Sequence, residues 1–340
     1  MKKNIRSYSL IKMNTVIADL GIEPYRSQQI FQWIWQKNAA DFSVMTNISK
    51  ELRKSLSEKF TISGLKIEKK LSAKDGSEKF LFRLEDNNFV EAVFIPEGKR
   101  KTICVSTQVG CPLACKFCAT ALMGFARNMK AYEIADEIRI IQREKKVKIT
   151  NLVFMGMGEP LLNLKEVAEA MDIISSSVGL SISQKRTTIS TAGLVDGLDY
   201  LLTSPLKVKL AISLNFPNEK VRKKMMPVAK QNPIKEILKL AREYSHTKNM
   251  VTFEYVLIDN LNDRLKDAQN LLKLLKGIPS KINLIPYNPH PTLPYKSPSQ
   301  EKIKKFHQYL LLSKHTITLR KSRGREILAG CGQLAGGVIK

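Results

Sequence analysis

Residues 102–118 have the sequence TICVSTQVGCPLACKFC, which joins a predicted strand to a cluster of three cysteines. A short β-rich run, Thr102–Ser106, leads into a loop where Cys111, Cys115 and Cys118 stand at the spacing C-x₃-C-x₂-C. Three thiolates on one loop can hold three irons of a cubane cluster, and the fourth iron is then left without a protein ligand. Because a substrate or cofactor can chelate that open iron, the loop predicts a reaction centre.

The strand before the cysteines is the first of a repeating pattern. Six β-rich runs alternate with amphipathic stretches of helical length, at spacings of roughly 25–45 residues, which favours βα units and a parallel sheet. Six units predict an α/β fold with an incomplete (βα)₆ barrel, whose active site lies at the C-terminal ends of the strands. The runs are Thr102–Ser106, Asn151–Met155, Arg186–Ser190, Val208–Leu214, Val251–Leu257 and Ile282–Ile285; a last strand, Thr316–Arg320, precedes the tail.

The charge of the chain points to a polyanionic partner. Lys and Arg number 56 against 31 acidic residues, so the 340 residues carry a net charge of +25. Such a potential favours nucleic acid, whereas a merely solvated basic surface is the alternative. The cluster Arg320, Lys321, Arg323 and Arg325 lies just before Cys331, which favours nucleic acid at the reaction centre.

The composition also indicates a compartment and a division into domains. No apolar run approaches the ~18 residues of a membrane helix, no signal peptide is evident, and the cysteines do not form a disulfide framework. We therefore expect a cytoplasmic protein that does not contact membranes. Three regions are predicted: an N-terminal accessory, RNA-binding domain with a β extension (1–95), a barrel core (96–315) and a C-terminal tail that carries Cys331 (316–340).

Zinc is the alternative metal for the cysteine loop. Zinc normally takes four ligands, supplied as two pairs or as Cys/His sets. Here three cysteines stand together, and the four histidines lie far away without ligand spacing: His246, His290, His307 and His315. The sequence therefore favours an iron–sulfur cluster.

Polar residues follow several of the predicted strands. Gly156-Met-Gly-Glu-Pro160 follows the second strand, where two glycines let the backbone approach a ligand and Glu159 can anchor an ammonium. The same rim carries Ser190, Thr191, Ser213, Leu214, Asn215 and Asn288. Helix capping and turn formation are the structural alternatives for these residues. Glu91 interrupts the apolar run 89–93, and from this pattern alone we expect a carboxylate that faces the surface.

In this chain Phe117 precedes the third cysteine, and Gly-Glu-Pro follows the second predicted strand. These motifs resemble those of the radical S-adenosylmethionine (SAM) superfamily. The flanking segments resemble the bacterial dual-specificity ribosomal and transfer RNA adenine-C2 methyltransferases, over roughly residues 20–335. These segments are 104–111, 156–160, Arg320-Lys-Ser-Arg-Gly and Gly330-Cys-Gly-Gln-Leu. The resemblance implies methylation of carbon 2 of adenosine 2503 in 23S rRNA, and of adenosine 37 in some tRNAs.

The resemblance also implies the cofactors and their ligands. Cys111, Cys115 and Cys118 would hold a [4Fe-4S] cluster, and two SAM molecules would be used in each turnover. The residues that match the family's SAM-binding positions are Gly158, Glu159, Ser190, Ser213, Leu214, Asn215 and Asn288. Asn215 stands where the family often has histidine, and an asparagine can still hydrogen-bond a ribose.

The same resemblance assigns three further roles. A first SAM would methylate Cys331, giving an S-methylcysteine intermediate, and a second would yield the 5′-deoxyadenosyl radical that takes a hydrogen from this methyl group. The carbon radical would add to adenine and form a transient protein–RNA crosslink. Glu91 matches the proton acceptor, and Cys104 would form a transient disulfide with Cys331 that frees the methylated base. The remaining implications are an electron donor such as flavodoxin and a monomeric enzyme.

Three other functions are alternatives to this one. The related adenine-C8 23S rRNA methyltransferase of the antibiotic-resistance type shares the cysteines, but it usually departs at Pro160 and in the run 320–324. A non-catalytic iron–sulfur or zinc RNA-binding protein gives no role to Cys104 and Cys331. A radical activase of another protein explains neither this pair nor the charge of +25.

Overall fold

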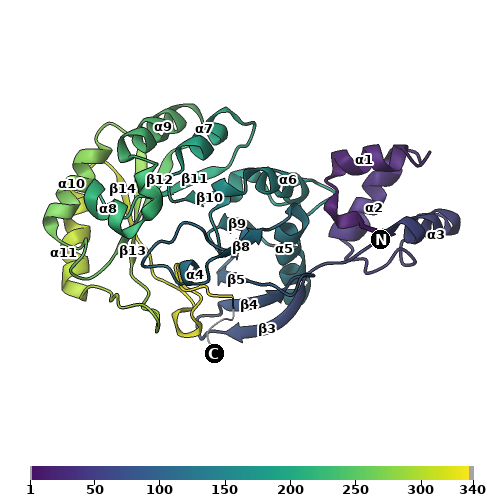
Figure 1. Cartoon of the computed structure of the whole chain (residues 1–340), viewed down its shortest axis with the longest axis horizontal. Coiled ribbons are helices and arrows are strands. Elements are labelled where there is room, and N and C mark those ends of the chain that lie inside the picture. Colours follow the sequence, from purple (N-terminus) through teal and green to yellow (C-terminus); the bar gives the residue numbers. More distant parts are fainter. Residues whose placement is uncertain (1, 337–340) are drawn as a thin grey trace.

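The computed structural model describes residues 2–336 and is built around a ten-stranded sheet (Figure 1). Seven of its strands run parallel in the order β14-β13-β12-β11-β10-β9-β6. They are β6 (Arg100–Val105), β9 (Asn151–Phe154), β10 (Thr187–Thr191), β11 (Lys209–Ser213), β12 (Val251–Leu257), β13 (Ser280–Pro286) and β14 (Thr316–Leu319). The predicted α/β barrel is confirmed: its six strands are present within two residues of their predicted bounds, and the last predicted strand joins them as a seventh.

Amphipathic helices cover the outer face of the parallel strands. In α9 the buried residues Ile234, Ile237, Ala241 and Tyr244 recur at helical spacing, so one stripe of the helix faces the sheet. No helix within residues 2–336 combines the length and apolar character needed to cross a bilayer. The helices of the barrel are α5 (Ala131–Lys145), α6 (Leu164–Ser175), α7 (Val195–Thr203), α8 (Glu219–Met225), α9 (Ile234–Thr247), α10 (Leu265–Leu275) and α11 (Gln300–Leu311).

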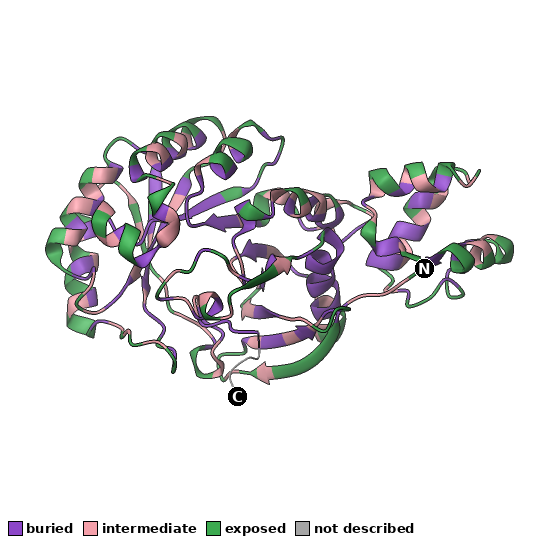
Figure 2. Cartoon of the chain, viewed as in Figure 1, coloured by how far each residue is buried: buried purple, intermediate pink, exposed green. Residues whose placement is uncertain are grey.

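Three antiparallel strands extend the barrel sheet beyond β6. They are β3 (Lys66–Ser72), β4 (Glu78–Arg83) and β5 (Phe89–Glu97), which pair in sequence order. Figure 2 shows the inner strands buried and the edge strand β3 exposed. The β extension predicted for the accessory region is therefore continuous with the sheet that carries the reaction centre.

The N-terminal helices form a separate layer beside α5 and α6 (Figure 1). They are α1 (Leu10–Ala18), α2 (Tyr25–Trp35) and α3 (Lys50–Lys59), with the short strands β1 (Lys3–Asn4) and β2 (Phe60–Thr61). The predicted apolar face of α2 is buried, because Ile30, Phe31, Ile34 and Trp35 are each no more than 1% exposed. An amphipathic pattern was sufficient to identify this face.

One buried carboxylate joins the accessory helices to the barrel. Asp136 of α5 accepts hydrogen bonds from Arg6 Nη1 (3.2 Å), Arg139 Nε (2.5 Å) and the backbone amide of Leu65 (2.9 Å). A Cβ at Gly64 would lie 2.2 Å from both Arg6 Nη1 and Asp136 Oδ2, so this close approach requires glycine. Arg6 belongs to the N-terminal layer and Arg139 to α5 of the barrel, so Asp136 links the two layers.

We predict that Asp136→Ala lowers the free energy of unfolding by about 3–5 kcal/mol, because it leaves two buried guanidinium groups without their carboxylate. Chemical denaturation of the cluster-free protein measures this change. Glu144→Ala on the same helix is the matched control, since its ion pair with Lys70 is about 40% exposed and should contribute no more than ~1 kcal/mol. Equal losses in the two variants would contradict the role given to Asp136.

Candidate active site

The cysteine loop is folded against its own continuation. After β6 the chain forms β7 (Gln108–Gly110), the loop 111–118, α4 (Ala119–Leu122) and β8 (Phe125–Asn128), and β8 pairs back on β7. The Cys111 amide donates to the carbonyl of Gly124 at 2.7 Å. A Cβ at Gly110 would lie 2.0 Å from that carbonyl oxygen, so glycine is required at this crossing. The loop is therefore a closed turn at the C-terminal end of the first barrel strand.

The three cysteines suit an iron–sulfur cluster. Burial raises the pKa of the Cys111 and Cys115 thiols, and the neighbouring Cys118 raises both further. A metal that bound these sulfurs would take them as thiolates and release their protons. Within residues 2–336, no group of three or more His, Cys, Asp and Glu side chains meets the geometry of a single-ion site. A thiol donor set of three fits a [4Fe-4S] cluster with one open iron.

The Gly156–Pro160 loop is locked beside the cysteine loop. Gly158 has φ +95°, and a Cβ there would lie 2.5 Å from Gln108 Cβ, so only glycine fits. The Glu159 amide donates to Gln108 Oε1 at 2.8 Å. The buried Glu159 carboxylate accepts from the Ala192 amide through Oε2 (2.8 Å) and from the Leu161 amide through Oε1 (3.1 Å). These bonds join the ends of the first three barrel strands.

Burial raises the pKa of Glu159 to about 7, while the amides of Ala192 and Leu161 act in the opposite direction. A cationic ammonium next to this carboxylate would favour its charged form. The role of Glu159 toward SAM stays a prediction.

A belt of polar side chains crosses the inside of the barrel at one register. Ser213, Glu254, Asn283 and Thr318 are direct neighbours on β11, β12, β13 and β14. Glu254 Oε2 accepts from the hydroxyls of Ser190 (3.1 Å) and Ser213 (3.4 Å), and its Oε1 lies 3.5 Å from Asn283 Nδ2. Two of the predicted site residues are therefore held by a carboxylate that the sequence analysis missed.

The available sequence signal for Glu254 was its place in β12, where it interrupts the apolar run Val251–Leu257. Three other predicted residues are fixed by contacts within the protein. Asn215, at φ +54°, accepts from the Val256 amide at 3.0 Å and lies 3.7 Å from Met226 Sδ through its amide nitrogen. Leu214 is fully buried, and Asn288 Nδ2 donates to the carbonyl of Cys331 at 3.2 Å. Their role in binding SAM stays a prediction.

The C-terminal tail returns to the cysteine loop, where it lies beside α4 (Figure 1). The Ala119 amide donates to the carbonyl of Gly332 at 2.8 Å, and Thr120 Oγ1 to that of Leu334 at 2.8 Å. Gln333 Nε2 donates to the carbonyl of Pro289 at 2.7 Å. The tail is thus fixed on one side to the residues after Cys118 and on the other to the loop after β13.

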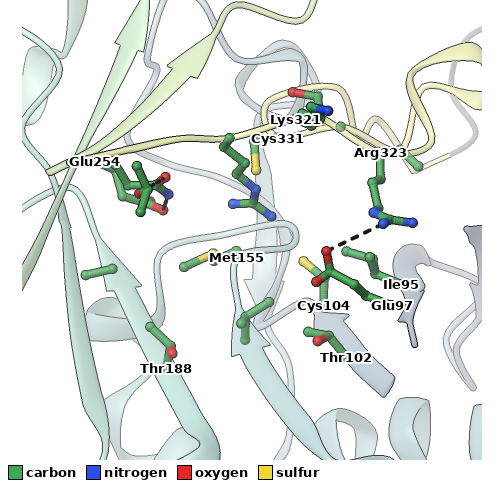
Figure 3. A pocket seen from close by; sticks show the side chains of 18 of the residues that line it. Ile95, Glu97, Thr102, Cys104, Met155, Thr188, Glu254, Lys321, Arg323 and Cys331 are labelled. Atoms are coloured by element: carbon green, nitrogen blue, oxygen red, sulfur yellow. Dashed lines mark hydrogen bonds and ion pairs between the residues drawn. The ribbon is translucent and has the colours of Figure 1, made fainter. Parts of the chain in front are cut away.

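Cys104 and Cys331 line one cavity of about 660 Å³ inside the barrel (Figure 3). Cys104 lies on β6 and is buried, whereas Cys331 lies on the tail, and both are free thiols. Burial raises the pKa of each thiol, and Arg320, which lines the same cavity, acts in the opposite direction on both. The two sulfurs predicted to act together do face a shared space.

Glu91 is buried, so the expectation of a surface carboxylate is wrong. The strand β5 lies between β4 and β6, and the tail covers Glu91 itself. Its Oε1 forms an ion pair with Lys79 Nζ at 3.0 Å, and its Oε2 accepts from the amides of Ala335 (2.8 Å) and Gly336 (3.3 Å). Sequence reasoning missed Lys79, which belongs to the neighbouring strand β4.

Comparison with known proteins finds similarity over the whole chain. The family model of the radical SAM superfamily matches residues 105–275, and that of the ribosomal RNA large subunit methyltransferase N-terminal domain matches residues 3–62. The dual-specificity RNA methyltransferase RlmN of Geotalea uraniireducens is 42% identical over 100% of this chain and 98% of the relative. That of Geobacter sulfurreducens is 43% identical over 98% and 92%. A radical SAM methyltransferase from Sphaerobacter thermophilus has a crystal structure that is 38% identical with a TM-score of 0.92, covering 98% of this chain and 99% of that one.

Glu159 gives a pH test of the site in the protein without its cluster. Its pKa rises on folding from 4.5 to about 7, so the folded state holds more protons than the unfolded state between these values. The free energy of unfolding should therefore fall by up to about 1.4 kcal/mol per pH unit across that window. Glu159→Gln should lack this component when denaturation is followed from pH 4.5 to 7. Parallel stability profiles for the two proteins would contradict the assignment.

Proposed function

This chain belongs to the radical SAM RNA methyltransferases, and we propose that it methylates carbon 2 of adenine in 23S ribosomal RNA and in transfer RNA. Members of this family use a [4Fe-4S] cluster and SAM. Two sequence features support carbon 2 rather than carbon 8, namely Pro160 after Gly-Glu and the Arg320–Gly324 run. The full-length similarity to relatives named dual-specificity RNA methyltransferases supports both RNA substrates.

The observation that carries the proposal is that Cys104 and Cys331 line one cavity. Carbon 2 of adenine is electron-poor, so it does not attack a sulfonium methyl group, and a methyl carrier with radical chemistry avoids this barrier. When bound, the cluster supplies the electron that cleaves SAM reductively. Cys331 carries the methyl group, because the tail fixes it beside the cysteine loop. The carbon radical formed from that methyl group would add to carbon 2, and the adduct would lose the C2 proton and one electron, equal to the electron supplied for SAM cleavage, to give a crosslink. The Cys104 thiolate then attacks the sulfur of Cys331: an S–S bond forms, the S–C bond breaks, and the released carbon takes a proton to become the methyl group.

Glu91 accepts the proton that leaves the adenine. Its ion pair with Lys79 orients the carboxylate toward the tail that carries Cys331. The amides of Ala335 and Gly336 occupy Oε2, so this segment has to release the oxygen before it takes a proton. Glu91 is therefore a catalytic base that the tail controls.

The charge of +25 supports an extended contact with RNA phosphates. Because the reacting sulfurs lie inside the barrel, the target base has to be extruded from the folded RNA before it reaches them. We further propose a monomer that works in the cytoplasm, where its RNA substrates are, and a one-electron donor such as flavodoxin. RNA is the partner that the charge distribution favours.

The cysteine pair gives a direct test of the mechanism. After anaerobic reconstitution with iron, sulfide and labelled SAM, the wild-type protein should place label in 2-methyladenosine, as nucleoside mass spectrometry measures. Cys331→Ala should give neither product nor crosslink, because the methyl carrier is missing. Cys104→Ala should accumulate the protein–RNA crosslink, because nothing resolves it. Recovery of 8-methyladenosine would contradict the carbon-2 assignment, and normal turnover of either variant would contradict the roles of the thiols.

Glu91→Gln should slow RNA methylation by about 100-fold or more, the usual contribution of a positioned general base, while Cys331 is still methylated. The rate of 2-methyladenosine formation and the peptide mass of Cys331 measure the two steps separately. Glu68→Gln on the exposed strand β3 is the control, since its ion pair with Arg83 is nearly half exposed. A Glu91→Gln rate within about threefold of the wild type would argue against proton transfer to Glu91.

A further inference from the structure

Arg222 of α8 is a fully buried cation without an ion-pair partner among the described residues. Its Nη2 donates to the carbonyl of Ala192 at 2.6 Å and its Nη1 to that of Asn232 at 3.2 Å. Its Nε is buried and has no hydrogen-bond partner. Glu219, on the same helix, is the nearest favourable charge to Arg222, but its ion pair is with Lys223 at 3.8 Å and it forms none with the guanidinium. A buried cation without a hydrogen-bonded carboxylate is costly.

The structure holds Arg222 against the cysteine loop. The Lys116 amide, next to Cys115, donates to the carbonyl of Met225 at 3.0 Å. Met225 lies three residues after Arg222, so the two share a face of α8. The ring of Phe117, on the cysteine loop, also packs against the ring of Phe216, with the two centroids 5.7 Å apart.

Arg222 is also connected to the predicted SAM site. The carbonyl oxygen of Ala192 accepts a hydrogen bond from Arg222, and the amide of Ala192 donates one to Glu159. A Cβ at Gly193 would lie 3.4 Å from Arg222 Nη2, so the loop after β10 packs closely on the guanidinium. Arg222 therefore binds the loop after β10 directly, and its helix α8 contacts the cysteine loop through Met225.

We propose that Arg222 is a positioning residue whose buried guanidinium balances the negative charge of the thiolate-bound cluster and thereby sets its reduction potential. This inference rests on the cluster assigned to Cys111, Cys115 and Cys118. Reduction transfers one electron from an external one-electron donor to the cluster, breaks no bond and adds one negative charge. A fixed cation in a low-dielectric surrounding stabilises the more negative, reduced form. The guanidinium stays protonated throughout, so no proton accompanies the electron.

A redox titration of the reconstituted protein, followed by the electron paramagnetic resonance signal of the reduced cluster, tests this inference without RNA. Arg222→Gln keeps a donor but loses the charge, and its potential should fall by about 59 mV, a tenfold shift of a one-electron equilibrium. Arg222→Lys keeps the charge and should stay within about threefold of the wild-type equilibrium. Lys224→Gln removes an exposed charge from the same helix and should change nothing.

A purely structural role makes a different prediction, because both Arg222 variants lose the guanidinium that clamps the carbonyls of Ala192 and Asn232. Equal potentials in the Gln and Lys variants would overturn the proposal. If Arg222→Gln does not fold or does not retain its cluster, Arg222→Lys decides: a wild-type potential supports the charge, and the same failure overturns it. The titration involves no methyl transfer, so an error in the carbon position assigned to the product would leave its result unaffected.

Discussion

The backbone amide of Ala119 and the hydroxyl of Thr120 hold the tail at the carbonyls of Gly332 and Leu334, across 214 positions of the sequence in the second case. Both donors directly follow Cys118, so the same short helix that ends the cysteine loop receives the segment that carries Cys331. On the other side, Asn288 and Gln333 join the tail to the loop after β13. If these bonds were lost, Cys331 would no longer face Cys104, and the cavity would lose one of its two thiols.

Several buried charges lie around the tail where it returns to the barrel. Glu91 is shared between Lys79 and the tail amides, Glu254 is held by serines of two other strands, and Arg320 lies in the cavity with both thiols. Burying a charge is costly, yet Glu254 and Arg320 line the cavity and Glu91 lies under the tail. Glu91 and Glu254 are held by residues of other strands and of the tail, so the order of the site depends on the barrel as a whole.

Local patterns were enough to predict most of the fold. Strand and helix periodicity identified the seven parallel strands and the buried face of α2, because each pattern repeats over a few neighbouring residues. The spacing of Cys111, Cys115 and Cys118 predicted the loop for the same reason. The environment of Glu91 could not be predicted, since it depends on β4, β6 and a tail about 240 residues later. Lys79, Arg222 and Glu254 were missed because their partners lie on other strands and loops, so no local pattern reveals the pairing. Only the charge inside an apolar strand hinted at Glu254.

We propose that the methyl group reaches RNA through Cys331. A pulse–chase experiment tests it directly: the reconstituted protein is incubated with labelled SAM, freed of excess SAM and then given RNA with unlabelled SAM. We expect one labelled methyl group on the Cys331 peptide before RNA is added, and its carbon in the 2-methyladenosine of the first turnover. Unlabelled first-turnover product together with a label that remains on Cys331, or product formed while Cys331 never carries a methyl group, would show that Cys331 is not the methyl carrier.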